Sequence, residues 1–463
     1  MHTKRYRKLS LKLCEEAVEE CFKSKWKRRD ILVFIEKYAG IGRTEILIDD
    51  LSGSRRVKEE AIHSIGLMLY GVVEDLVEYG IEPDDMEPPT IRQRPDGMTG
   101  KTRDIALLSI LHQLIGHVEK LMIEPLISAR LLPTQHASIP GRGQTLLKDQ
   151  AHRYLLKETV GVRYIQKTDV VHAYATLKYQ VCVDILKKEI PKAKAAIVLL
   201  EYLGRIAPDG HLIIGGYIDA WLFNFAMSYA ISDLYAQGTT RRGKKIPYVI
   251  RAVTFMDDFA LMSRSIKGLK RATKHLDKYF REKMGIELKT TSGISKILTI
   301  EEEKRRRSLP GKAQRGVPML DMAGYRISRT HITIRRRVFR RARRQFIRGY
   351  RELTETGTLR RDRARKIISY NSYVIQTDSD GLIEKYHIDD LMRTAKEINA
   401  FYQRLDQQKR KEWLHVLQER RGREAAEGDT GTSAGREDIR PSCGQYPAVQ
   451  TGGSAGSDDV PVR

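Results

Sequence analysis

Two neighbouring carboxylates, Asp257 and Asp258, are the residues whose type and spacing point most directly to chemistry in this chain. They stand between two apolar runs, 252–256 and 259–262, and this pattern predicts a buried β-hairpin with both acids at its tight turn. Adjacent carboxylates repel each other, so holding them together costs free energy unless a cation lies between them. Oxygen ligands of this kind favour a divalent metal ion. The alternative is an ordinary solvated turn, because Asp is a common turn residue.

A third acid, Asp169, follows the β-rich segment 162–168 and precedes the aromatic residue Tyr174. An Asp at the end of a strand can bind a metal ion, and the backbone after it can reach a triphosphate. The other interpretation is an N-cap for the helix that follows. We interpret His172 as structural, because no second His or Cys stands at ligand spacing.

The charge of the chain predicts a polyanionic partner. Its 463 residues include 83 Lys and Arg against 59 Asp and Glu, a net charge of +24. Between residues 304 and 366 there are 22 Lys or Arg and only 4 acids. Solvated helix faces usually mix the two signs, so this run, with its predicted helix over 335–344, indicates a track for a nucleic-acid backbone.

Other classes of protein are disfavoured by the sequence. No apolar stretch is long enough to cross a bilayer, and the basic start of the chain does not lead into the apolar core of a signal peptide. We therefore expect a cytoplasmic protein without a membrane partner. Four scattered cysteines lack a CxxC pair, so neither a disulfide framework nor a zinc site is indicated.

Helices and hairpins must position these acids. Apolar periodicity predicts helices over 9–82, and the prolines at 83, 88 and 89 indicate a connector. Residues 91–105 predict a hairpin with basic residues on both arms, which either binds phosphates or is simply solvated. The Gly-rich segment 135–144 is a weak phosphate-loop signal and is better explained as an ordinary loop. Further helices are expected near 107–126, from 145, over 177–204, from about 217, over 266–283 and on to about 420, with a short strand at 286–289. A disordered tail is expected over 424–463.

These motifs, in this order, resemble those of the reverse transcriptases, and most closely the small bacterial enzymes related to retron, diversity-generating and group II intron reverse transcriptases. The resemblance covers about 91–385. It is carried by the segments Lys101–Arg103, Ser138–Gly143, Asp169–Tyr174, Ile214–Asn224, Phe255–Asp258, Gly285–Lys289, Ala323–Ile327 and Ser369–Tyr373.

The resemblance implies an α+β, right-hand polymerase fold. Its parts would be a helical N-terminal extension (1–82), fingers (90–160), a palm with an antiparallel sheet (161–330) and a helical, basic thumb (331–420). The implied activity is RNA-directed DNA synthesis by two-metal nucleotidyl transfer. Its partners would be an RNA template, deoxynucleoside triphosphates, and a DNA or RNA primer or a priming protein hydroxyl.

The resemblance also implies roles for individual residues. Two Mg²⁺ ions, with Mn²⁺ as a substitute, would be bound by Asp169, Asp257, Asp258 and the backbone of Val170. Lys289 would protonate the leaving pyrophosphate. The nucleotide-binding set would be Lys101, Arg103, Val171, His172, Ala173, Tyr174 and Gly215. The nucleic-acid-binding set would be Arg142, Gly324, Tyr325, Arg335, Arg336, Arg337, Arg340 and Arg341.

One departure from the family pattern leaves alternatives open. Asp219 and Ala220 stand where the bacterial enzymes have Ser-Gln or Ser-Pro in the template-contact motif. This change motivates a noncatalytic RNA-binding protein on a polymerase scaffold as the alternative. An RNA-directed RNA polymerase is a third possibility, against which Tyr174 weighs because its ring would clash with a ribose 2′-hydroxyl. No HNH or GIY endonuclease pattern is evident, which favours a retroelement or phage-defence role; template, primer and oligomeric state stay open.

Overall fold

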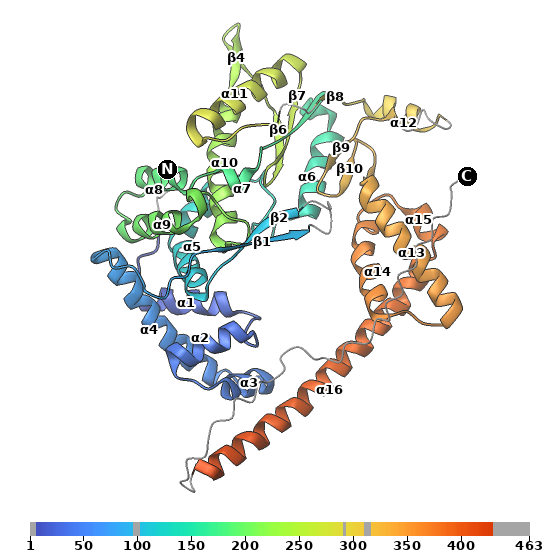
Figure 1. Ribbon diagram of the computed structural model, residues 1–463. Coiled ribbons are helices and arrows are strands. Elements are labelled where there is room, and N and C mark those ends of the chain that lie inside the picture. Colours follow the sequence, from blue (N-terminus) through green and yellow to red (C-terminus); the bar gives the residue numbers. More distant parts are fainter. Residues whose placement is uncertain (1–5, 96–101, 290–292, 310–315, 429–463) are drawn as a thin grey trace.

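The first four helices of the chain form a unit whose buried apolar side chains belong to the same core as those of the helices that follow. In the computed structural model, which describes residues 6–95, 102–289, 293–309 and 316–428, the predicted helices over 9–82 are confirmed (Figure 1). Ser10 begins the first of them by accepting a hydrogen bond from the amide of Leu13 (3.3 Å), as an N-cap does. The helices are α1 (Leu11–Phe22), α2 (Arg29–Ala39), α3 (Arg43–Ser52) and α4 (Arg56–Glu78).

A second group of helices connects this unit to the sheet. Helices α5 and α10 are apolar on nearly all sides, and both are accordingly buried along most of their length. Between and beside them lie shorter helices. The group comprises α5 (Ile110–Arg130), α6 (Gln144–Leu156), η1 (Glu158–Val160), α7 (Ala173–Thr176), α8 (Tyr179–Glu189), α9 (Lys194–Ile206), η2 (Pro208–Gly210) and α10 (Tyr217–Ala236).

The central sheet has four antiparallel strands in the order β6-β7-β3-β8. Side chains of β7 alternate between two cores: Phe259 packs with α10 and α11, whereas Met262 packs with α6 on the other face. Sliding a strand by one residue would turn each side chain toward the opposite face, into a core that it does not fit, and the register is thereby fixed. The strands are β3 (Tyr164–Asp169), β6 (Arg251–Phe255), β7 (Asp258–Ser263) and β8 (Ile294–Lys296), and α11 spans Ile266–Met284.

Three smaller β-elements surround this core. The predicted hairpin at 91–105 is confirmed as β1 (Thr90–Pro95) paired with β2 (Thr102–Leu107). Another hairpin joins β4 (Gly238–Arg241) to β5 (Lys244–Pro247). A three-stranded sheet is formed by β9 (Leu320–Met322), β10 (Tyr325–Ile327) and β11 (Ile332–Ile334), and α12 (Ile300–Arg307) precedes it.

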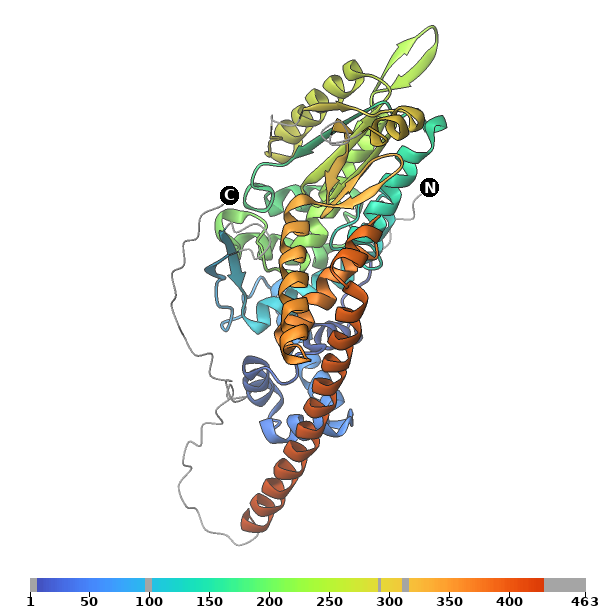
Figure 2. The same cartoon turned by 90° about the vertical axis from the view of Figure 1, so that its right-hand side faces the viewer.

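The C-terminal helices have a separate core around Phe346 and Leu391. They are α13 (Arg336–Thr356), α14 (Arg361–Val374), α15 (Asp380–Lys385) and α16 (Ile388–Gly428). Helix α16 runs back along the molecule to the N-terminal helices, as Figure 2 shows, and the Arg410 guanidinium donates to the carbonyl of Asp50 at 3.0 Å. The first and last helical parts of the chain are therefore in direct contact.

Two predictions about elements were wrong in detail. Residues 286–289 do not form a strand; Leu288 makes a single antiparallel bridge to Val170, one residue beyond the end of β3, and the pairing extends no further. The predicted disordered tail starts too early, since α16 continues through 424–428. The remainder of that tail, 429–463, lies outside the described residues. Among those described, no helix is long and apolar enough to cross a membrane.

Candidate active site at the end of the central sheet

The predicted hairpin at the two acids is confirmed. Strand β6 ends at Phe255, β7 begins at Asp258, and these two residues pair with each other. The connection therefore consists of Met256 and Asp257, and Met256 adopts a left-handed conformation with φ of 53°. A two-residue connection of this kind reverses the chain while keeping the strands paired. Asp257 lies on the turn, and Asp258 lies on the first position of the strand.

Strand pairing brings the third acid to the same place. Asp169 is the last residue of β3 and stands directly opposite Asp258 in the antiparallel register. The amide of Val170 donates to the carbonyl of Asp257 at 3.2 Å. The N-cap interpretation of Asp169 was wrong, because α7 begins three residues after Val170 with His172 in the N-cap position. All three acids thus meet at one end of the sheet.

The pKa of Asp257 reflects the negative charges around it. Burial raises the pKa of this carboxyl to about 7, and the charge of Asp169, a side-chain hydrogen bond to Asp169 and the charge of Asp258 add to the increase. A carboxyl that shares a proton with a neighbour behaves in this way, since two carboxylates in contact resist ionising together. Asp169 therefore adds to the negative charge around Asp257, beside Asp258.

Two lysines compensate part of this charge. The Lys289 ammonium pairs with Asp169 Oδ2, and its backbone amide donates to the Asp169 carbonyl at 2.8 Å. Lys167 Nζ lies 3.0 Å from Asp258 Oδ1. Lys289 was predicted to act here, whereas Lys167 was missed. Its only sequence signal is its place two residues before Asp169 on the same strand, which puts both side chains on one face of the sheet.

The oxygen atoms at this site fit a hard divalent cation. Asp169 Oδ1 is buried and accepts no hydrogen bond from an amide, ammonium or hydroxyl group, so this oxygen can act as a metal ligand. Asp257 faces it, and a cation between the two would relieve the repulsion that raises the pKa of Asp257. In the described ranges, no three His, Cys, Asp or Glu side chains are already gathered as metal ligands. Asp258 instead pairs with Lys167, and metal binding by Asp258 stays a prediction.

The segment after Asp169 only partly matches its predicted role. Tyr174 stacks on Phe223 with ring centroids 5.4 Å apart, and burial with the charges of Asp219 and Asp257 raises its pKa. Its ring is thus held beside the acids. The Val171 amide donates to the carbonyl of Glu287 at 2.9 Å, and its predicted contact with a triphosphate stays a prediction. His172 is exposed at the start of α7 and Ala173 is its first residue; their nucleotide contacts stay predictions.

The basic hairpin is attached to the body of the protein near Gly215. Arg103 lies on an exposed part of β2, opposite Arg94 of β1. Ala106 is the buried residue of β2, and its amide donates to the carbonyl of Ile214 at 2.7 Å. Lys101 lies outside the described residues. Gly215 is therefore close to the hairpin backbone, while its contact with a nucleotide remains a prediction.

Arg142 and Arg335, both of the predicted nucleic-acid-binding set, make structural contacts. Arg142 Nη1 donates to the carbonyls of Leu132 (2.6 Å) and Gln135 (3.1 Å), so this guanidinium closes its own loop. This agrees with the ordinary-loop interpretation. Arg335 pairs with Asp321 at 2.5 Å and ties the start of α13 to β9.

The segment Ala323–Ile327, one of those that carry the resemblance, includes the tight turn between β9 and β10. Gly324 occupies the turn with φ of 88°, and the ring of Tyr325 is buried. Tyr373 of α14 packs on Tyr325 with ring centroids 5.4 Å apart and donates to Gln144 Oε1 at 3.1 Å. Tyr373 thus connects the C-terminal helices to this hairpin, and the loosely matching motif 369–373 was its only sequence signal.

The basic run is divided between surface and structure. Arg336, Arg337 and Arg340 are exposed on α13, Arg341 is half-buried, and Val338, Ala342 and Phe346 form the opposite, buried side. Arg329 belongs to the same run, but it is buried and donates to the carbonyls of Leu298 and Val162, both at 2.6 Å. Counting charges along the sequence therefore overestimates the basic surface.

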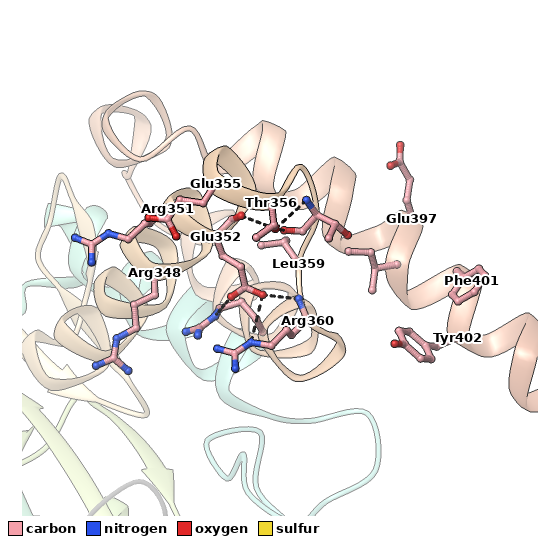
Figure 3. Close-up of a pocket in the computed structure, with 13 residues that line it drawn as sticks. Arg348, Arg351, Glu352, Glu355, Thr356, Leu359, Arg360, Glu397, Phe401 and Tyr402 are labelled. Atoms are coloured by element: carbon pink, nitrogen blue, oxygen red, sulfur yellow. Dashed lines mark hydrogen bonds and ion pairs between the residues drawn. The ribbon is translucent and has the colours of Figure 1, made fainter. Parts of the chain in front are cut away.

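A cavity of about 840 Å³ lies among the C-terminal helices, away from the acids (Figure 3). Glu352 at its centre accepts from the Arg360 amide at 2.6 Å and from Arg363 Nε at 2.9 Å, while Phe401 and Tyr402 contribute from α16. It was not anticipated from the sequence.

Comparisons with known proteins give weak likenesses. No protein-family model and no curated protein matches this chain. Matching solved structures include apo telomerase of Candida tropicalis (TM-score 0.40, 10% identity, 81% of this chain and 75% of that chain). Others are the same enzyme truncated from its C-terminal domain (0.38, 10%, 62% and 69%) and telomerase of Candida albicans in complex with a TWJ fragment of telomeric RNA (0.37, 11%, 72% and 66%).

Proposed function

We propose that this protein is an RNA-directed DNA polymerase of right-hand architecture, with a helical N-terminal extension. The observation that carries the proposal is the antiparallel pairing of Asp169 with Asp258, which puts the Asp257 carboxyl in contact with Asp169. The exposed arginines of α13 provide a surface for the backbone of a nucleic acid. The fingers would be the β1–β2 hairpin and its neighbours, the palm the central sheet, and the thumb α13 to α16.

The residues at the site have separable roles in this proposal. Asp169, Asp257 and the carbonyl of Val170 would hold two Mg²⁺ ions, which supply activation of a primer 3′-hydroxyl and stabilisation of the leaving pyrophosphate. Lys167 holds Asp258 in place at the first position of β7. Lys289, whose ammonium already lies at Asp169, would give a proton to pyrophosphate.

Selection of the sugar would depend on Tyr174. Its ring is fixed by stacking on Phe223 and cannot move aside freely, so a ribose 2′-hydroxyl would meet it. Deoxynucleotides would therefore be preferred to ribonucleotides. The context we propose is a retroelement or a phage-defence system.

Primer extension tests the proposal. Purified protein with an RNA template, a DNA primer, deoxynucleotides and Mg²⁺ should extend the primer, and Asp257→Ala should abolish extension. Asp184→Ala is the matched control, because Asp184 is an exposed acid of α8 that bonds only to Gln180 in the described structure. Activity that persists in Asp257→Ala would refute the assignment.

A noncatalytic RNA-binding scaffold is the second candidate. It is favoured by the ion pairs of Lys289 and Lys167, which already compensate two of the acids without a metal ion. Titration with Mg²⁺ separates the two candidates. Salt-sensitive RNA binding without any metal-dependent nucleotide binding would support the scaffold.

A further inference from the structure

Asp219 is a buried acid that the polymerase proposal does not use. It lies in the first turn of α10 and is 1% exposed. Its Oδ1 accepts two hydrogen bonds, from the amide of Ile213 and from the hydroxyl of Tyr179, both at 2.8 Å. Tyr179 is itself buried on α8. Asp219 therefore joins α8, α10 and the loop 213–216 at one atom.

The loop 213–216 is tightly packed at its two glycines. A Cβ atom on Gly216 would lie 1.7 Å from Asp219 Oδ2. A Cβ atom on Gly215 would lie 2.5 Å from the carbonyl oxygen of Ala106, and Gly215 has a φ of 119° that side chains rarely adopt. The loop is consequently packed between Asp219 on one side and strand β2 on the other.

The contact with β2 locates the basic hairpin. Strand β1 is exposed along its whole length, and in β2 only Ala106 is buried. Its amide donates to the carbonyl of Ile214 at 2.7 Å. Since little else of the described hairpin is buried, a shift of the loop would move the strand that carries Arg103.

We propose that Asp219 is a positioning residue: by fixing the loop 213–216 against Ala106, it holds the basic hairpin in place for the incoming triphosphate. This rests on the proposed polymerase function. Asp219 touches neither the acids nor the hairpin itself, so its effect passes through Ile213 and the two glycines. The Asp that stands here in place of the Ser of the bacterial enzymes would therefore help to place the hairpin.

Two substitutions of Asp219 distinguish a role in placing the hairpin from a general loss of stability of the fold. Asp219→Asn keeps an oxygen that can accept both hydrogen bonds, whereas Asp219→Ala leaves the Ile213 amide and the Tyr179 hydroxyl without an acceptor. Losing buried hydrogen bonds of this kind should raise the KM for deoxynucleotides about 10-fold or more in the Ala variant, with kcat changed less than about 3-fold. The Asn variant should stay within about 3-fold of the wild type in both constants.

Hydrogen exchange gives a readout that does not need activity. The amide of Ala106 should exchange faster in Asp219→Ala and at the wild-type rate in Asp219→Asn. If Asp219→Ala does not fold, Tyr179→Phe removes one donor without opening a large cavity and should show the same change to a smaller degree. Unchanged exchange at Ala106 in Asp219→Ala, or a loss of kcat with KM unaltered, would overturn the proposal. A wild type without polymerase activity but with these exchange rates would refute only the proposed function.

Discussion

Replacing Asp257 by Asn should stabilise the protein in the absence of metal ions. The carboxyl of Asp257 is held against Asp169, and its pKa is about 7 in place of the ordinary 3.8. The folded chain therefore binds this proton more tightly than the unfolded chain. Stability falls as pH rises through this window, because the unfolded state then ionises first. Asparagine never ionises and escapes this cost.

The size of the effect follows from the two pKa values. The difference between about 7 and 3.8 corresponds to about 4 kcal/mol at pH above 7, at 1.36 kcal/mol for each pKa unit. Because the unfolded carboxyl is already ionised at about pH 5, the gain of Asp257→Asn over wild type should grow by about 2 to 3 kcal/mol between about pH 5 and about pH 8. Relaxation of the nearby lysines would reduce the observed value.

Urea unfolding at several pH values in the presence of a chelator measures this gain. Asp258→Asn is the matched control, since it makes the same change one residue away but takes the partner from Lys167, 3.0 Å distant; no gain is expected. Adding Mg²⁺ should then stabilise the wild type and leave Asp257→Asn nearly unchanged. If the gain in the free energy of unfolding of Asp257→Asn does not vary with pH, or if this variant is less stable than the wild type at pH 8, the Asp257 carboxyl is not crowded against Asp169.

Three further outcomes follow from the structure. Tyr174→Ala should improve ribonucleotide use about 10-fold or more relative to deoxynucleotides, measured as kcat/KM for each; an unchanged ratio would remove the ring as the basis of sugar selection. The double substitution Arg336→Ala and Arg340→Ala should weaken RNA binding. The slope of the logarithm of the association constant against the logarithm of the salt concentration should become less negative by about 1.5. A slope equal to that of the wild type would show that neither arginine contacts the RNA backbone. Arg410→Glu should loosen the contact of α16 with α3, seen as a broader distance distribution between spin labels on the two helices, because the new carboxylate would face the Asp50 carboxylate, whose Oδ2 now lies 3.3 Å from the Arg410 guanidinium. Arg404→Glu, an exposed site on the same helix, is its control, and equal distributions in the two variants would contradict the inference.

Local patterns in the sequence were sufficient for much of the scaffold. The apolar runs on either side of Asp257 and Asp258 predicted the hairpin, since a strand that is buried on both faces leaves a continuous apolar stretch in the sequence. Helices with apolar periodicity were predicted for the same reason, and Gly285 ended α11 as expected. The segment 286–289 was misassigned because a short alternating stretch that makes only one bridge looks the same in sequence as a strand.

Function at the site depended on contacts that the sequence does not encode locally. Asp169 meets Asp258 through pairing of β3 with β7, and Lys289 reaches Asp169 from 120 residues away. Such pairings are chosen by the fit of whole surfaces, so neither partner carries a local sign of the other. The division of the basic run has the same cause, since Arg329 differs from its exposed neighbours only in where the fold places it.

By itself, the sequence determined the charge of the protein, the helices, the hairpins and the identity of the acids, because these depend on residues close together in the chain. Only the tertiary structure decided which acid faces a lysine, which amides are already occupied and that Asp219 holds a loop against β2. Long-range packing and hydrogen bonding set those features, and they exist only when the whole chain has folded.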